Sequence, residues 1–528
     1  MANINTLYIY GFKKFENLII SFEKKMNIIV GENEVGKSTI LEAIKIVINQ
    51  LYKNADKSIL KDLFNKQQVE KFKNDPCVEN LPKIHIELDL DLNAKDKNAE
   101  YFFGENNRDK KEKFGIKFEC AFNEEIGDNI LEVINKGNIP YEYYNFSWIT
   151  YAKQQYYLIK RPLNFISINV SETDNNTSFN YCNKTLFNSI YSETDRINSK
   201  TKFRSKINEI FSELNLDNID EHRKFGINDK KIILETLLSV YEDSISLENK
   251  GSGMSSLIKT QIALDKPKNH LDVILMEEPE NHLSYTTLNK MLSEIENKKS
   301  DSQIIIATHN NLIASRLNLK NVIWINDNKS KSLNYIPSND ADFFVKADNN
   351  NFLQLLLSKK AILVEGATEF LLLPTLYKQL TGESIEKDEI SIISCNGISY
   401  YHYLKIMEQT NKKIAVLTDN DKKQSRIDFA KQFNDNETIN KYQHIFMGNN
   451  IEQDWTWESC FYALNRELID SLIEVEDNAE YLFHGEDYGK VLGKMLNNKV
   501  DSAYKILISG EKFKIPQYVQ DAIKWLRE

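Results

Sequence analysis

The chain has 528 residues, a length that predicts two or three domains rather than a single hydrophobic core. A hydrophobic fraction of 41% is ordinary for a globular protein. The five scattered cysteines, without a C-x-x-C pair, argue against a disulfide scaffold or a zinc site. Without a leader sequence or membrane span, we expect a cytoplasmic protein, and its net charge of −10 leaves only local basic clusters to contact nucleic acid.

A glycine-rich loop separates the first buried strand from the first long helix. The apolar run 26–30 predicts the strand, and the periodic pattern of 37–48 predicts the helix. The spacing Gly31-x4-Gly36-Lys37-Ser38 suits a phosphate-binding loop better than an ordinary turn. Its glycines let the backbone surround phosphates, Lys37 bridges phosphate oxygens and Ser38 binds Mg²⁺. The predicted ATP-binding residues of this segment are Gly31, Asn33, Gly36, Lys37, Ser38 and Thr39.

The next predicted elements alternate between strands and helices. Alternating apolar residues predict a half-buried strand at 83–92, and a second strand is expected at 165–170. From 175 to 248 the pattern becomes helical, with apolar residues at helical spacing from Ile233 to Tyr241. Gly251-Ser252-Gly253 then opens another helix.

Two strands that end in polar residues follow. The strand 273–276 ends in Glu277-Glu278, where the first acid holds Mg²⁺ and the second, as a catalytic residue, polarises the attacking water. Asp is usual at the first place, and the alternative is a solvated acidic turn. The strand 304–307 ends in Thr308-His309. A lone strand-end histidine is more often structural, but in this order we expect His309 to contact the γ-phosphate.

These motifs in this order resemble an ABC-type ATPase head of the kind found in chromosome-maintenance and recombination proteins. The opening run 10–15 (YGFKKF) is also similar to that group. The resemblance implies a dimer in which Ser252 and Gly253 of one subunit close over the ATP of the other. We therefore expect an ABC-type P-loop ATPase domain at 1–345, containing the helical insertion 175–248.

A polar stretch at 338–351 predicts a linker, after which a second α/β domain is expected at 346–528. Its strand 361–364 ends at Glu365-Gly366, and a helix from Thr368 carries Glu369. The strand 414–418 ends at Asp419-Asn420-Asp421. Because the carboxyl ends of parallel strands meet at one edge, these acids are expected to gather there. Oxygen ligands suit Mg²⁺ or Mn²⁺, and two such ions support phosphodiester cleavage. The alternative is a pair of polar turns.

This arrangement resembles the TOPRIM domain, which is Rossmann-like. An ABC-type head followed by TOPRIM resembles the OLD (overcoming lysogenization defect) nucleases over nearly the whole chain. The resemblance implies catalytic roles for Glu365, Asp419, Asp421 and Lys499, and metal binding by Glu365, Glu369, Asp419, Asp421 and Glu458. It also implies that 175–248 is the dimerisation insertion. The run His282-Leu283-Ser284-Tyr285 departs from the family's His-Leu-His-Pro, which puts ATP turnover in doubt but not ATP binding.

Basic pairs are short and scattered. Lys422-Lys423 follows Asp421 directly and is the best placed to meet a DNA phosphate, although such pairs are usually solvated. No dedicated sequence-reading module is apparent.

The leading hypothesis is an ATP-regulated, Mg²⁺- or Mn²⁺-dependent DNA endonuclease in antiviral defence, forming a dimer or tetramer through its head. One alternative is a non-cutting ATP-dependent DNA clamp. A topoisomerase or primase would need a further domain after residue 500. A third possibility is an effector activated by a helicase or by a retron reverse transcriptase with its noncoding RNA or DNA. The sequence does not choose between autonomous and partner-activated forms.

Overall fold

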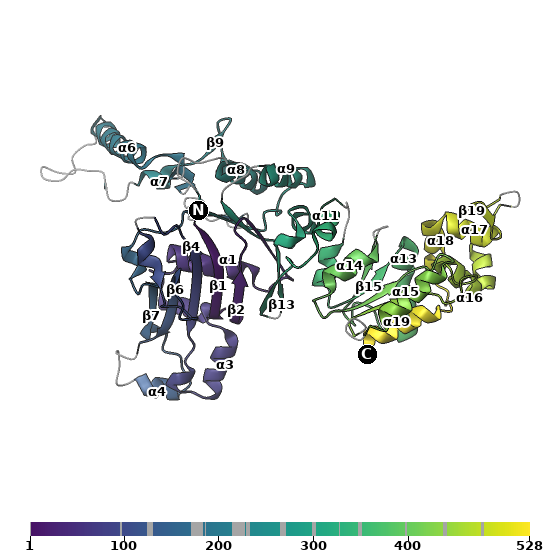
Figure 1. The fold of residues 1–528 in the computed structure, drawn as a ribbon. Coiled ribbons are helices and arrows are strands. Elements are labelled where there is room, and N and C mark those ends of the chain that lie inside the picture. Colours follow the sequence, from purple (N-terminus) through teal and green to yellow (C-terminus); the bar gives the residue numbers. More distant parts are fainter. Residues whose placement is uncertain are drawn as a thin grey trace. The chain divides into compact units, whose positions relative to one another are not determined.

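The structure is a computed structural model. It describes residues 2–95, 98–123, 130–169, 183–184, 186–188, 190–213, 228, 233–264, 271–297, 302–326, 328–346, 351–395, 399–436, 441–476 and 480–528. The chain forms two compact units, Met1–Asn334 and Tyr335–Glu528 (Figure 1). In the described segments no helix has the length and apolar character that crossing a membrane requires.

The first unit contains an antiparallel sheet with the strand order β2-β1-β4-β6-β5, and β7 pairs with β6. Apolar residues alternate along β1 and β4, so that one face of the sheet is buried. The predicted strand 83–92 corresponds to β4. The strands are β1 (Asn3–Phe12), β2 (Phe15–Ser21), β4 (Ile84–Asp91), β5 (Phe103–Gly104), β6 (Lys113–Phe122) and β7 (Tyr144–Thr150).

The second sheet of this unit has the order β14-β13-β3-β12-β11-β8, and all neighbours except β13 and β14 are parallel. Its central strands are continuous apolar runs, as expected for parallel strands covered on both faces. The strands are β3 (Met26–Val30), β8 (Phe165–Asn169), β11 (Val273–Glu277), β12 (Gln303–Ala307), β13 (Val322–Asn326) and β14 (Lys329–Ser332).

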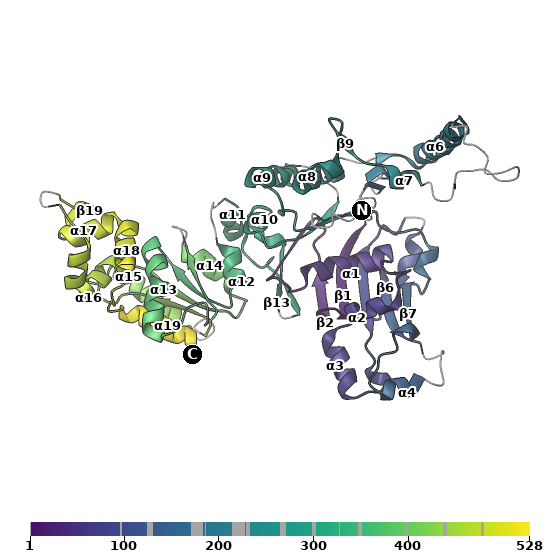
Figure 2. The ribbon, with the colours of Figure 1, turned by 180° about the vertical axis from the view of Figure 1, so that it is seen from behind.

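Helix α1 (Lys37–Asn49) packs against both sheets of the first unit (Figure 2). Its apolar residues are buried almost all around, so it forms the centre of the core rather than a surface helix. The Trp148 indole donates a hydrogen bond of 2.8 Å to the Ile46 carbonyl, and the Tyr156 hydroxyl donates one of 3.0 Å to the Ile48 carbonyl. These two hydrogen bonds hold the last turn of α1 against the residues around β7.

The region 175–248 lies partly outside the described residues. Its described part includes the helix α6 (Glu193–Glu213), in agreement with the helical pattern. The helix predicted at 233–241 is wrong in extent, because α7 covers only Leu234–Leu237. The chain then forms the short hairpin β9 (Tyr241–Glu242) and β10 (Ile245–Ser246). Its turn residues Asp243 and Ser244 have φ values of 48° and 67°.

Other helices of the first unit cover its sheets and edges. They are α2 (Leu60–Leu63), α3 (Lys66–Asn74), α4 (Ile130–Asn135), α8 (Ser252–Leu264), α9 (Tyr285–Asn297) and α10 (Asn311–Arg316).

The second unit has a parallel sheet with the order β16-β15-β17-β18. Ile362 and Val364 of β15 face a core that includes α13 and α19, whereas the side chain of Leu363 points to the opposite face. The strands are β15 (Lys360–Val364), β16 (Ile390–Ser394), β17 (Lys413–Leu417) and β18 (Gln443–Phe446), and a hairpin consists of β19 (Leu482–Phe483) and β20 (Glu486–Asp487).

The helices of the second unit cover both faces of the sheet. They are α11 (Ser338–Lys346), α12 (Phe352–Leu357), α13 (Ala367–Thr381), α14 (Tyr400–Met407), α15 (Gln424–Asn434), α16 (Trp457–Leu472), α17 (Lys490–Asn497), α18 (Lys499–Ile508) and α19 (Gln517–Arg527).

The linker predicted at 338–351 is wrong for residues 338–346, which form α11. Phe344 is buried against Phe352 and Tyr403, and Phe343 stacks on His402 at 4.3 Å. The carboxylate of Asp340 lies 2.7 Å from the ring nitrogen Nδ1 of His402. Because α11 packs within the second unit, that unit starts at Tyr335, ahead of the predicted boundary after residue 345.

Candidate functional site

The glycine-rich loop connects β3 to α1 in the predicted place. Gly36 precedes the helix with a φ of 105°, which favours glycine, and a Cβ atom there would lie 2.4 Å from the Phe15 ring. The buried Lys37 donates hydrogen bonds of 2.9 Å from its ammonium group to the carbonyls of Gly31 and Glu32. The side chains of Asn33 and Ser38 are exposed. Lys37 therefore lies across a loop whose outer residues are accessible to a nucleotide.

The strand β11 brings acids close to this lysine. Burial lowers the pKa of Lys37, and the nearby carboxylates of Glu278 and Glu280 act in the opposite direction. Glu277 accepts a hydrogen bond of 2.9 Å from the Asn169 amide of β8. Glu278 accepts one of 2.8 Å from the Asn281 amide. Glu277 and Glu278 thus have separate partners, one on β8 and one in the turn after β11.

Glu280 connects the two strand ends. Its Oε1 atom accepts a hydrogen bond of 2.5 Å from the Thr308 hydroxyl and one of 3.3 Å from the His309 amide. Its other oxygen, Oε2, is buried without a hydrogen-bond partner. The ring nitrogen Nδ1 of the half-exposed His309 lies 3.5 Å from Glu278 Oε1. A buried, unpartnered carboxylate oxygen beside Lys37 suits a site that receives Mg²⁺ and phosphate.

Glu280 has no role in the sequence-based prediction. The signal is present in the run Glu277-Glu278-Pro279-Glu280, where it is the third acid. Its importance depends on contact with Thr308, which lies 28 residues away in sequence.

Helix α8 starts at the predicted Gly-Ser segment. Gly253 is so closely packed that a Cβ atom there would lie 2.3 Å from the His282 carbonyl oxygen, in the turn after Glu277 and Glu278. Gly251 and Met254 are exposed beside it. Because the side chain of Ser252 lies outside the described residues, only its backbone position at the start of α8 is known.

The predicted acids of the second unit lie at the carboxyl edge of its parallel sheet. Glu365 follows β15, and Asp419 follows β17, which pairs directly with β15. Glu369 lies in the first turn of α13, and its Oε2 atom would be 2.9 Å from a Cβ atom on Gly366. Glu458 lies in the first turn of α16. We call Glu365, Glu369, Asp419 and Glu458 the acid cluster.

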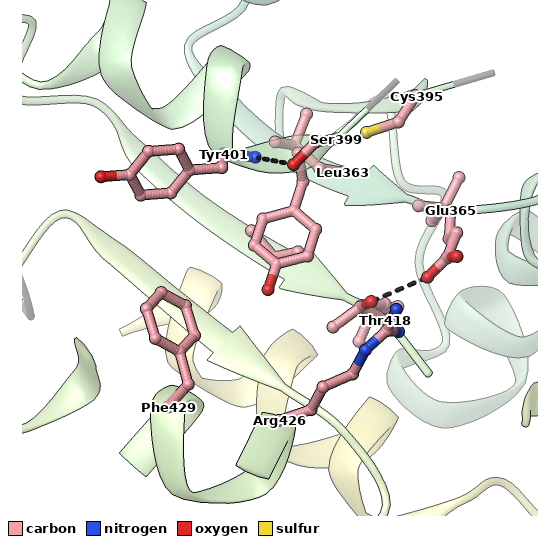
Figure 3. A pocket seen from close by; sticks show the side chains of 12 residues that line it. Leu363, Glu365, Cys395, Ser399, Tyr401, Thr418, Arg426 and Phe429 are labelled. Atoms are coloured by element: carbon pink, nitrogen blue, oxygen red, sulfur yellow. Dashed lines mark hydrogen bonds between the residues drawn. The ribbon is translucent and has the colours of Figure 1, made fainter. Parts of the chain in front are cut away.

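Each member of the acid cluster has a different polar environment. Glu365 accepts a hydrogen bond of 2.8 Å from the Thr418 hydroxyl (Figure 3). Asp419 accepts one of 2.9 Å from the Trp457 amide at the start of α16. The buried Glu458 accepts one of 2.9 Å from the Thr368 hydroxyl, and its other oxygen lies 3.2 Å from the ammonium nitrogen of Lys499.

The carboxylates of the acid cluster shift one another's pKa values. Burial raises the pKa of Glu369 to about 7, with a further contribution from Glu458. Burial and the carboxylates of Glu369 and Glu458 also raise the pKa of Asp419 well above its usual range. Burial would lower the pKa of Lys499, but the carboxylates of Glu458 and Asp419 outweigh it and raise that pKa. The cluster therefore carries an excess of negative charge that a cation would relieve.

Asp421 is turned away from the acid cluster. Its φ is 47°, and its carboxylate lies 2.8 Å from the Arg426 guanidinium, which also donates a hydrogen bond of 3.1 Å to the Asp419 carbonyl. The structure thus brings Glu365, Glu369, Asp419, Glu458 and Lys499 together and places Asp421 on a neighbouring ion pair.

Asn420 holds the turn between the two aspartates. Its buried amide donates hydrogen bonds of 3.0 Å to the carbonyls of Gly448 and Asp454, and its oxygen accepts one of 2.9 Å from the Lys422 amide. We predict that Asn420→Ala lowers the free energy of unfolding of the second unit by about 3 kcal/mol, because buried carbonyls lose their donors. Urea unfolding checks this, with Lys423→Ala on the exposed side of the same turn as the control. Equal stability of the two variants would contradict it.

The donor chemistry of the acid cluster suits Mg²⁺ or Mn²⁺, which prefer carboxylate oxygens. Within the described ranges, however, no three acidic, histidine or cysteine side chains are arranged so that they could hold one metal ion. In the present arrangement Glu365 accepts a hydrogen bond from Thr418, and Glu458 contacts Thr368 and Lys499. Metal binding would require these side chains to exchange their present partners for the ion.

The ammonium group of Lys422 makes its contacts within the second unit. Its ammonium nitrogen lies 4.9 Å from the centre of the Trp455 ring and 4.6 Å from that of Tyr488, and it forms a 3.1 Å ion pair with Glu486. The residue therefore fastens the β19–β20 hairpin to the turn after β17. Lys423 is exposed, which leaves it as the member of the pair directed to solvent.

Comparison with known families divides the sequence in the same way as the fold. Residues 3–185 match the AAA ATPase domain family, and residues 171–315 match the family described as AAA domain, putative AbiEii toxin, Type IV TA system. Residues 356–421 match the overcoming lysogenization defect protein-like TOPRIM domain. The chain joins an ATPase domain to an OLD-like TOPRIM domain. The predicted resemblance to the OLD family and the predicted fold class are confirmed.

Two curated proteins are similar to parts of this chain. The Old nuclease of Escherichia phage P2 is 27% identical over 176 residues, which cover 31% of this chain and only 30% of that protein. The retron Vc95 probable ATPase of Vibrio cholerae serotype O1 biovar El Tor is 24% identical over 393 residues, covering 61% of this chain and 73% of that protein. Among solved structures, the recombination mediator RecF with ATP has a TM-score of 0.34 and 11% identity, with coverage of 63% and 99%.

Proposed function

We propose that this protein is an ATP-binding, divalent-metal-dependent DNA endonuclease that acts in cytoplasmic antiviral defence. The observation that carries the proposal is the convergence of Glu369, Asp419 and Glu458 with Lys499 at one sheet edge of an OLD-like TOPRIM domain. Perturbed pKa values of carboxylates gathered beside a buried ion pair are typical of functional sites.

The acid cluster would hold Mg²⁺ or Mn²⁺, with two ions expected from the family resemblance. Bound there, such ions activate a water molecule and stabilise the leaving oxygen in phosphodiester cleavage. Lys499 is directed at the same place and would stabilise negative charge on the phosphate. Asp421 would join the cluster only if Arg426 releases it, which would free that guanidinium for a DNA phosphate.

The head would bind ATP and regulate cleavage. Lys37 and Ser38 would contact the phosphates and Mg²⁺, while Glu277, Glu278 and His309 would surround the γ-phosphate. Ser252 and Gly253 would complete the site in a second copy of the chain. This arrangement requires a dimer or a larger homo-oligomer.

Similarity to a retron ATPase supports a second candidate, an effector that remains silent until a partner activates it. The partner would be a retron reverse transcriptase with its noncoding RNA or DNA, or a helicase. The same acid cluster would perform the chemistry in both versions.

Plasmid cleavage tests the function. We expect the full-length protein to nick supercoiled plasmid with Mg²⁺ or Mn²⁺ and to lose at least about 100-fold of this activity as Glu365→Ala or Asp419→Ala. Glu467→Gln, an exposed acid on α16, serves as the matched control. Cleavage that survives both cluster substitutions would defeat the proposal, whereas inert wild-type protein with and without ATP would favour the partner-activated version.

A further inference from the structure

A cavity of about 440 Å³ lies beside the acid cluster, between α14 and α15. The strand residues Leu363 and Val416 form part of its floor. The cavity thus occupies the face of the sheet to which Leu363 points, at the carboxyl ends of β15 and β17. Cavities of this size accept small organic groups, and in parallel sheets ligands bind at this edge.

Two aromatic side chains form one side of the cavity and remain accessible. Tyr401 of α14 is 42% exposed and Phe429 of α15 is 43% exposed. Figure 3 shows both rings on the side opposite Glu365. The ammonium nitrogen of Lys405 lies 5.4 Å from the centre of the Tyr401 ring and adds positive charge there. Rings this exposed contribute little to the core and present flat faces for stacking.

The other side of the cavity is polar and adjoins the proposed reaction site. Glu365, Thr418 and Arg426 line it (Figure 3). The Arg426 guanidinium connects the cavity to the aspartate turn through the Asp421 carboxylate and the Asp419 carbonyl. A group in the cavity would therefore lie next to a phosphate held at the acid cluster, with Arg426 between the two.

We propose that this cavity binds an unpaired nucleobase of the DNA strand that is cut, next to the scissile phosphate. The inference rests on the proposed nuclease function and names the form of its substrate. Aromatic faces stack on bases of any sequence, while the exposed Ser399 of the cavity lining offers a hydroxyl group to the base edge. A base within a duplex is stacked on both faces and must leave the helix to enter. The favoured substrate is therefore single-stranded or locally unpaired DNA.

Fluorescence of 2-aminopurine tests the subsite independently of cleavage. The full-length protein is titrated into a single-stranded oligonucleotide that carries 2-aminopurine, with Ca²⁺ in place of Mg²⁺. We expect quenching on binding, because the base stacks on an aromatic ring. The variant Tyr401→Leu/Phe429→Leu keeps the cavity apolar and is expected to bind at least about tenfold more weakly, with quenching lost. Tyr504→Leu removes a 55% exposed ring on α18 and should behave as wild type.

Four results bear on the inference. Weaker binding of the matching duplex together with lost quenching in the double variant supports it. Wild-type affinity and quenching in the double variant overturn it. A free deoxynucleoside monophosphate is compared with an unlabelled strand of the same length as competitor. If both displace the labelled oligonucleotide at the same concentration, the cavity binds mononucleotides and the strand proposal is overturned. Quenching that follows the predicted pattern in a protein that does not nick plasmid would support the subsite while ruling out autonomous cleavage in favour of the partner-activated version.

Discussion

Replacing Glu369 by glutamine will stabilise the metal-free protein at pH 8 by about 3 kcal/mol. Burial first, and Glu458 second, raise the pKa of the Glu369 carboxyl from 4.5 to about 7. The unfolded chain has an ordinary glutamate, so the folded state binds this proton more tightly. The stabilisation that comes from binding this proton is fully present below pH 4.5 and is lost as the pH rises through about 7. Glutamine keeps the shape of the side chain without the buried charge.

Urea unfolding of the second unit in EDTA at pH 5, 7 and 8 measures this effect. The advantage of Glu369→Gln over wild type should be small at pH 5 and largest at pH 8, while the control Glu467→Gln shows no such trend. Mg²⁺ should stabilise wild type at pH 8 and have little effect on Glu369→Gln, because a bound cation neutralises the same repulsion. A difference in stability between Glu369→Gln and wild type that does not change with pH would show that the Glu369 carboxylate is not destabilised by burial and neighbouring negative charge.

Lys37→Ala will lower ATP affinity by about 100-fold, because the phosphates lose a charge-assisted donor. The lysine is buried and bonded to the carbonyls of Gly31 and Glu32, which shows that its ammonium group is already directed at the phosphate loop. The nearby Glu278 and Glu280 also lose their positive neighbour. Titration with ATP and Mg²⁺ by calorimetry measures the change.

The control for this prediction is Lys25→Ala, an exposed lysine just before β3 at the far end from the loop. Unfolding in urea without nucleotide establishes that both variants fold. If Lys37→Ala binds ATP as tightly as Lys25→Ala, the nucleotide site lies elsewhere.

The elements that position the sites were predictable because they are buried on both sides. The strands β3, β11, β12, β15 and β17 are short apolar runs that end in polar residues, a pattern typical of parallel sheets. The failures occurred where tertiary contacts outweigh local composition. α11 is rich in Asn and Asp, yet Phe344 buries it against Tyr403. The apolar periodicity at 233–241 gives way to a hairpin whose turn needs positive φ at Asp243 and Ser244.

The part of the candidate site that lies at the strand ends was predictable for the same reason. Because the carboxyl ends of parallel strands meet at one edge, Glu365 and Asp419 were expected there. Glu369 was expected beside them because only a short turn separates β15 from α13. Glu458 and Lys499 follow from family resemblance alone, because α16 and α18 reach the site through packing that no local pattern reveals. The direction of Asp421 depends on Arg426 and on the Asn420 hydrogen bonds, which only the folded chain supplies.

Titration of Mn²⁺ into the full-length protein tests the central claim most directly. Calorimetry without nucleotide in a Glu277→Gln/Glu280→Gln background removes the acids of the proposed metal site in the head. The acid cluster predicts Mn²⁺ binding that is lost when Glu369→Gln and Asp419→Asn are added, together with loss of plasmid nicking when the same pair is made in the wild-type chain. Undiminished Mn²⁺ binding in the substituted protein, or nicking that persists without these two carboxylates, would contradict the account.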